Sequence, residues 1–241
     1  MRLAAVLVLA ILAGCAGAPP PPATSAPPHL PKVELRGCDN LSGDFPVPVD
    51  AAKALLPEGF EPVLAMDAPP MAVLFVVALQ CEHGLVDGVD AGPTSVGYEE
   101  LDVVPPAALR TNGSTDYTVP VFFVAQPAAV GDALAALHLG NAGKGVVTRD
   151  AAGFTVTMGG ASFTLQGAGG PDGAKLSGGP FGVFGVQKKK LVTTIDASVT
   201  DATLATAALA VRGQGAPLLD QARPVARGGA ASGFSLVFAP R

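Results

Sequence analysis

Short runs of β-branched and other apolar residues, separated by glycine and proline, recur through most of this 241-residue chain. The chain has 30 glycines and 23 prolines, which favour turns and interrupt helices. The runs lie at 60–65, 71–79, 94–104, 116–125, 145–149, 153–158, 161–166, 181–187, 190–199 and 234–238. Residues 201–211 fit a strand or a helix. The pattern predicts a mainly β fold.

Two short helices are expected among these strands. Asp50 can cap a first helix at 51–56, which Pro57 ends. A second helix at 127–139 has Pro127 in its first turn and Gly140 at its end. Such a string of strands predicts an α+β fold built on a curved antiparallel sheet or a closed β-barrel or cone. A barrel of this kind usually encloses an apolar pocket.

The first fifteen residues have the pattern of an export signal. A positive start at 1–2 is followed by an apolar run at 3–11, which is too short to span a bilayer as a stable helix. Residues 12–15 (Leu-Ala-Gly-Cys) resemble a bacterial lipobox. The resemblance implies cleavage before Cys15 and a lipid on its thiol. The expected partner is therefore a membrane of the cell envelope.

Ala16 follows the cysteine at the position where some diderm bacteria place an inner-membrane retention aspartate. By that resemblance we expect the outer membrane in a diderm organism, and the outer face of the plasma membrane in a monoderm.

The sequence divides into three parts. Residues 1–14 are expected to be a lipoprotein signal peptide. Residues 15–32 are the lipidated cysteine and a proline-rich tether, because 16–31 carry no charge and four consecutive prolines favour an extended spacer. Residues 33–241 form one β-rich globular domain, which is long enough to bury a sizeable core.

Composition excludes some functions. The net charge of −5, two tyrosines and no tryptophan argue against a nucleic-acid partner, which would need a cationic face. No phosphate loop, serine-nucleophile elbow or zinc-binding helix is present in the sequence. We therefore expect neither a cofactor nor a metal ion.

Once Cys15 is lipidated, Cys38 and Cys81 remain. Two thiols in an oxidising compartment predict one disulfide. The alternative is a metal site, since Cys81, Glu82 and His83 are adjacent. Adjacent residues on a strand point to opposite faces and chelate poorly, which favours the disulfide.

A series of motifs follows in a fixed order between residues 40 and 165. Val-Pro-Val-Asp at 47–50 precedes Leu-Leu-Pro-Glu-Gly-Phe-Glu-Pro at 55–62, then an apolar strand, then Tyr-Glu-Glu at 98–100. The expected second helix and the turn around Lys144 continue this order. The order resembles that of the acetoacetate decarboxylase-like superfamily. The resemblance implies a β-rich cone or barrel with a central cavity.

In active members of that superfamily a lysine after the helix forms a Schiff base with a β-keto acid. The amine must be neutral near pH 7, so its pKa must fall by several units. Lys144 is the lysine at that place, but it stands among glycines, without the proline and second lysine of the family run. The run at 188–190 has lysines but comes too late in the order. A solvated turn is therefore the alternative for Lys144.

The carboxylates at 99 and 100 are the other candidate site residues. On a strand, Tyr98 and Glu100 share one face, while Glu99 shares the opposite face with Leu101. The resemblance places Glu100 in the cavity, whereas the apolar pattern places Glu99 inside. That both are surface charges stays open. A buried carboxylate would need a partner, and Arg110 is a candidate.

Three functions are compatible with these features. The main expectation is an exported, membrane-anchored lipoprotein whose barrel binds a small apolar or carboxylated ligand without catalysis, through Tyr98, Glu99 and Arg110. The alternative is a Schiff-base decarboxylase or lyase that uses Lys144 and Glu100. A structural envelope lipoprotein with a filled core is the third.

Overall fold

The computed structural model describes residues 29–65, 69–111, 114, 116–139, 141–143, 145–169, 174–214, 218–222 and 227–241. The expected signal peptide, Cys15 and most of the tether lie outside the described residues, and so does Lys144. No helix in the described ranges is both long and apolar enough to cross a bilayer.

Strands make up most of the described chain, as the glycine- and proline-punctuated pattern predicts. They are β1 (Val33–Pro48), β2 (Glu61–Pro62), β3 (Leu64–Ala65), β4 (Met71–Val86), β5 (Val89–Asp90), β6 (Thr94–Val104), β7 (Tyr117–Gln126), β8 (Asn141–Gly143), β9 (Gly145–Arg149), β10 (Gly153–Met158), β11 (Ala161–Gly169), β12 (Ala174–Gln187), β13 (Lys190–Gln214) and β14 (Arg227–Pro240). The α-helices are α1 (Val49–Lys53) and α2 (Ala128–Ala136), and single 3-10 turns are η1 (Ala107–Leu109) and η2 (Leu219–Gln221).

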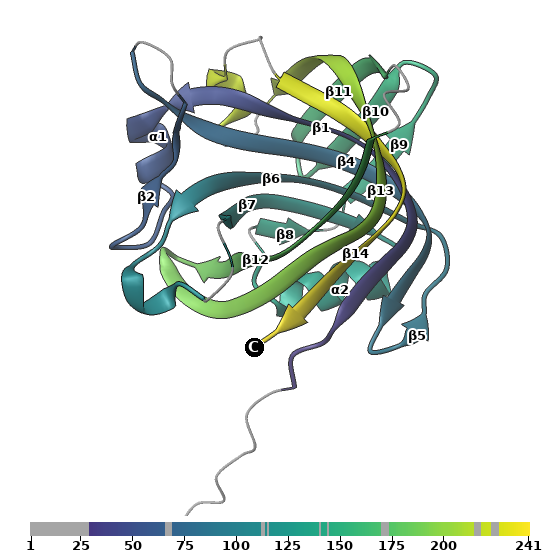
Figure 1. Cartoon of the computed structure of the whole chain (residues 1–241), viewed down its shortest axis with the longest axis horizontal. Helices are drawn as coiled ribbons and strands as arrows, with labels where there is room; N and C mark the ends of the chain where they lie inside the picture. The colour runs from purple at the N-terminus through teal and green to yellow at the C-terminus, as the bar shows by residue number, and fades with distance from the viewer. Residues whose placement is uncertain are drawn as a thin grey trace, which may run out of the picture.

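Seven of the described strands close into a barrel, which confirms the predicted architecture. The order around the ring is β1, β4, β6, β7, β12, β13 and β14, and β14 pairs back to β1. Neighbours in the ring are antiparallel, except that β12 pairs briefly with β7 in parallel. In Figure 1, β13 and β14 cross the side of the barrel nearest the viewer, and β6 and β7 lie behind them.

The same sheet also folds into a second layer. The last residues of β13, 207–214, leave the barrel and pair with β11, and β10 and β9 follow in order. β9 and β10 contact β4, β6 and β7, so this second layer covers the outside of the barrel there. Residues 201–211, which fit a strand or a helix by sequence, are therefore part of one 25-residue strand.

The two layers create two apolar cores. In the lumen, Phe123 of β7 meets Phe238 of β14 with ring centroids 6.3 Å apart, although these strands are not neighbours in the ring. Leu134 of α2 packs into this lumen core. Between the layers, Phe122 of β7 meets Phe163 of β11 at 5.9 Å. Strands β4, β6 and β7 are thus buried on both faces.

The first helix differs from its prediction. It begins at Val49 and ends at Lys53, and no side chain caps its first turn, so the expected cap by Asp50 is wrong. Pro48 occupies the N-cap position with an extended backbone because it continues directly from β1. The chain then turns through 54–59 without further helix.

The predicted disulfide between Cys38 and Cys81 is present. The two cysteines are directly opposite on β1 and β4, and their sulfur atoms are 2.11 Å apart. Both thiols are used in this bond, which excludes the alternative metal site. In the chain-entropy model, closing a loop of this length stabilises the fold by about 4 kcal/mol.

Candidate functional site in the barrel lumen

Strand β6 carries two adjacent buried carboxyls, one on each face. Its alternation places Glu100 on the lumen side with Tyr98, and Glu99 on the side covered by the second layer. Glu99 has 0% of its surface exposed and Glu100 has 9%. The possibility that both are surface charges is wrong. The family resemblance placed Glu100 inside and the apolar pattern placed Glu99 inside. Both are correct, because the second layer also buries the outer face of β6.

Glu100 is held in the lumen by a partner on β7. The hydroxyl of Thr118 donates to Oε2 of Glu100 at 3.0 Å. Burial, followed by the charge of Asp102, raises the pKa of Glu100 from 4.5 to about 8, although the Thr118 hydrogen bond acts in the opposite direction. The carboxyl is therefore protonated at neutral pH and can give a proton to a bound molecule.

Further acids lie on the same face toward the end of the lumen. Burial, followed by the charges of Asp44 and Asp116, raises the pKa of Asp102 from 3.8 to about 7. Asp44 lies in the same row of the sheet as Glu100, because both pair with Phe75 of β4. This end of the lumen therefore carries two carboxyls, Glu100 and Asp102, whose pKa values lie near neutral pH.

Tyr98 forms the inner boundary of this acidic region. Its ring stacks on Phe123 at a centroid distance of 5.0 Å with an interplanar angle of 6°. Burial, followed by the charge of Glu100, raises the pKa of the Tyr98 phenol well above 10, so the phenol stays neutral. Together with Phe238, these rings fill the lumen at this level. The apolar pocket expected inside the barrel is occupied here by the chain's own aromatic side chains.

Glu99 has different surroundings on the other face of β6. Neither of its carboxyl oxygens has a hydrogen-bond partner within the described chain. Burial, followed by the charge of Asp220 in η2, raises the pKa of Glu99 from 4.5 to about 8. Its neighbours across the sheet are Val76 and Phe122. The surroundings are those of a core position rather than of a ligand site.

Arg110 lies at the surface, after η1. Its Nε donates to the carbonyl oxygen of Pro105 at 3.1 Å. No contact joins it to Glu99 or Glu100 among the described interactions, so the structure does not pair this candidate with either carboxyl. A ligand-binding role for Arg110 stays a prediction.

The residue that sequence reasoning missed is Thr118. Glu99 pairs with Phe122, but Glu100 pairs with Pro120, so a bulge leaves Val121 of β7 unmatched. The bulge places Pro120 and Thr118 on the lumen face beside Glu100 and Asp102. No local signal in the sequence marks this bulge, and counting by alternation from Phe123 would have placed Thr118 on the opposite face.

Three surface hollows have been located in the described part of the chain, and none of them is lined by Tyr98, Glu99 or Glu100. One lies between Leu55, residues 119–121 of β7 and the β12–β13 turn, and two lie beside β1. The candidate site in the lumen therefore rests on its buried acids rather than on an open cavity.

Solved structures with the same arrangement exist. Acetoacetate decarboxylase from Legionella pneumophila matches with a TM-score of 0.59 and 9% identity, over 91% of this chain and 92% of that one. The enduracididine biosynthesis enzyme MppR, complexed with pyruvate, matches with a TM-score of 0.55 and 12% identity, over 91% of both chains. The fold is acetoacetate decarboxylase-like.

An acetoacetate decarboxylase-like enzyme from Sphingomonas wittichii RW1 matches with a TM-score of 0.54 and 14% identity, over 87% of this chain and 90% of that one. No protein-family model matches the sequence, and no curated protein matches it. The likeness confirms the fold expected from the motif order and extends it from residues 40–165 to most of the chain. At these identities it is a likeness of fold alone.

Proposed function

We propose that this protein is a lyase or decarboxylase of small keto acids that acts through a Schiff base on Lys144, with Glu100 as the proton-transferring group. The observation that carries the proposal is the carboxyl of Glu100, which is buried in the lumen of an acetoacetate decarboxylase-like barrel and held there by Thr118. Structures of the same fold include a protein named acetoacetate decarboxylase and one complexed with pyruvate, a keto acid.

The proposed chemistry divides between the two residues. The neutral amine of Lys144 attacks the ketone carbon, water leaves, and a proton taken up from solvent gives a protonated imine. Carbon dioxide then leaves, and the electron pair of the broken bond moves into the imine. Glu100, protonated at neutral pH because its pKa is about 8, donates its proton to the resulting enamine carbon. Water finally releases the product ketone and the amine, and the proton that the amine gives up returns to Glu100.

Trapping of the imine tests the proposal. Borohydride is added to the full chain with acetoacetate or with pyruvate, and the mass of each lysine-containing peptide is measured. We expect a reduced adduct on Lys144 that is lost in Lys144→Ala. Lys188→Ala is the matched control, because Lys188 lies in the other lysine run and should leave the adduct unchanged. An adduct on other lysines only, or none, would contradict the proposal.

Non-catalytic binding of a small apolar or carboxylated ligand is the second candidate. The stacked rings of Tyr98 and Phe123 favour it, because they give an apolar surface beside the buried carboxyl of Glu100. Saturable binding of a keto acid by calorimetry, without adduct and without release of carbon dioxide, would identify this function.

We also propose that the protein is exported and held to a membrane by lipid on Cys15, with residues 16–31 as its tether. The disulfide between Cys38 and Cys81 supports export, because disulfides persist mainly in oxidising compartments. Mass spectrometry of the membrane fraction should find an acylated amino-terminal Cys15, and Cys15→Ala should release the protein from the membrane. Recovery of the unprocessed chain from the cytosol with free thiols would contradict this.

A further inference from the structure

A polar groove lies beside β1, on the side that the second layer covers and apart from the acids of the lumen. Two of the surface hollows, of about 390 and 420 Å³, meet there, and both are lined by Asp39 and Arg149. Their volumes fall within the range of small-molecule sites, roughly 300–1,000 Å³. The shared residues make the two hollows the halves of one groove.

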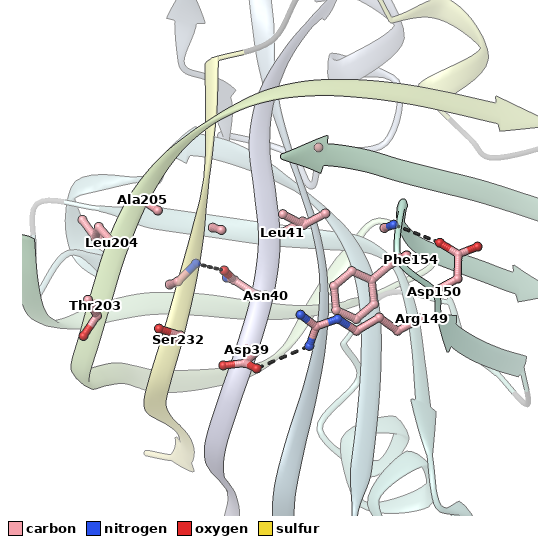
Figure 2. A pocket seen from close by; sticks show the side chains of 15 residues that line it. Asp39, Asn40, Leu41, Arg149, Asp150, Phe154, Thr203, Leu204, Ala205 and Ser232 are labelled. Atoms are coloured by element: carbon pink, nitrogen blue, oxygen red, sulfur yellow. Dashed lines mark hydrogen bonds and ion pairs between the residues drawn. The ribbon is translucent and has the colours of Figure 1, made fainter. Parts of the chain in front are cut away.

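An ion pair stands between the two halves. Nη1 of Arg149, at the end of β9, lies 3.3 Å from Oδ2 of Asp39 on β1. The guanidinium carbon lies 5.2 Å from the ring centroid of Phe154. Figure 2 shows the guanidinium between the Asp39 carboxylate and the Phe154 ring. Two contacts thus orient Arg149, and a planar guanidinium keeps further N–H groups for a ligand.

The first half of the groove presents hydrogen-bond donors. Oδ1 of Asn40 accepts from the backbone N–H of Ala231 at 2.8 Å, which orients the amide so that its NH₂ group is directed away from this contact. Thr203 and Ser232 are opposite each other on β13 and β14, and both line the hollow. In Figure 2 these side chains lie along one wall, with Leu204 beside them. The hollow therefore offers amide and hydroxyl groups beside a small apolar surface.

The second half is polar as well. Gln80, Glu82, Thr94 and Ser95 line it together with the shared ion pair, and Pro93 and Cys81 line it as well. Amide, carboxylate and hydroxyl groups in such a mixture can both donate and accept hydrogen bonds. This composition suits a ligand with many hydroxyls better than an apolar one.

Charge narrows the class of ligand further. The carboxylates of Asp39, Asp150 and Glu82 outnumber the guanidinium of Arg149, so an anionic ligand would be repelled. A metal cation is also disfavoured, because no metal-binding group of acids, histidines or cysteines occurs in the described ranges. Oδ1 of Asp150 accepts backbone N–H groups of the following turn, at 2.8 and 3.0 Å, rather than facing the other acids.

We infer that this groove binds an uncharged saccharide of two or more units that lies across the Asp39–Arg149 pair. The carboxylate of Asp39 accepts from one sugar hydroxyl while Arg149 donates to a neighbouring one, and Asn40, Thr203 and Ser232 contact the next unit. This site is independent of the proposed keto-acid chemistry, because neither Glu100 nor its partner Thr118 lines it.

The test is a glycan microarray probed with the full chain, followed by calorimetry with the best-bound trisaccharide and with spermidine and citrate as charged comparisons. We expect saturable binding of uncharged glycans and no comparable binding of spermidine or citrate. Binding of spermidine or citrate alone, or no binding to any glycan, would overturn the inference.

Two variants locate the site. Arg149→Met should weaken binding about tenfold or more, the loss expected for a hydrogen bond to a charged group. Ser232→Phe, at an exposed position on β14, should block the first hollow sterically. Arg36→Met is the matched control, because Arg36 forms an exposed ion pair with Glu34 on the same strand, outside the groove. Glycan binding unaffected in both groove variants would overturn the assignment even if binding itself is real.

Discussion

The two faces of β6 bury the same functional group in different surroundings. Glu99 and Glu100 are consecutive, and burial raises the pKa of each to about 8. In the lumen Glu100 accepts a hydrogen bond from Thr118 and lies beside another titrating acid, Asp102. Between the layers Glu99 has no hydrogen-bond partner within the described residues.

The difference shows that a perturbed pKa alone does not identify a functional residue. Desolvation acts on both carboxyls, but only Glu100 is positioned by a hydrogen bond within the described chain and lies on the lumen side of the barrel. For Glu99 the raised pKa expresses the free-energy cost of burying a carboxyl among Val76 and Phe122. The comparison can be tested by measuring the free energy of unfolding and the decarboxylation activity separately for variants of the two carboxyls.

The largest expected effect is on the pH dependence of stability. Between pH 4.5 and about 8 the folded protein binds protons at Glu99 and Glu100 that the unfolded chain releases, so raising the pH favours unfolding. The free energy of unfolding should fall by on the order of 4 kcal/mol for each carboxyl across this range. Urea unfolding at pH 5, 7 and 9 measures this. The control is Glu99→Gln combined with Glu100→Gln, which should flatten most of the slope, and a flat profile in the unchanged protein would contradict the buried pKa values.

Glu99→Met should stabilise the protein. A flexible apolar side chain replaces a carboxyl that has no hydrogen-bond partner, so the free energy of unfolding at pH 7 should rise by about 2 kcal/mol. Glu99→Gln is the matched control, since its amide would stay without a partner and should give no such gain. Thermal and urea unfolding measure both, and a loss of stability in Glu99→Met would mean that the carboxyl has a role in the fold.

Thr118→Val, in the lumen, should destabilise the protein, whereas Glu99→Met should stabilise it. It removes the donor to Glu100 and should lower the free energy of unfolding by about 1 kcal/mol. The pKa of Glu100 should rise further, because this hydrogen bond is what lowers it. Carboxyl titration by NMR checks the pKa. An unchanged titration would show that the Thr118 hydroxyl does not hold Glu100.

Glu100→Gln should have the smallest effect on stability, within about 0.5 kcal/mol at pH 7, because the amide oxygen still accepts from Thr118 and the carboxyl it replaces is already neutral. Decarboxylation activity should be affected much more than stability by this substitution. Release of carbon dioxide from acetoacetate should be lost, while the imine on Lys144 can still be trapped with borohydride. Full decarboxylation by this variant would remove Glu100 from the proposed mechanism.

Much of the fold could be predicted from local pattern. The bounds of β6, β9 and β10 coincide with the predicted runs, because turns with glycine or proline limit each of them. The bounds of α1 and β1 could be predicted less well from the sequence. The segment 33–46 has mixed polar and apolar residues, and its length as a strand depends on pairing with both β4 and β14.

The candidate site was predictable only in part. The alternation that separates Glu99 from Glu100 follows from the strand period, and Glu100 was correctly placed on the cavity side by resemblance to a known family. Thr118 was not predictable, because the bulge at Val121 depends on how β7 matches β6. Arg110 was expected beside a carboxylate and instead contacts Pro105, since charge alone does not say which way a loop turns.

The sequence by itself determined where strands can form, which side chains alternate across them, and that two cysteines remain to pair. These properties are local, because they follow from the backbone period and from turn residues. Only the tertiary structure decided that both faces of β6 are interior, since the covering strands β9–β11 lie some forty residues or more further along the chain. Burial depends on what packs over a strand, and that is a property of distant segments rather than of the strand itself.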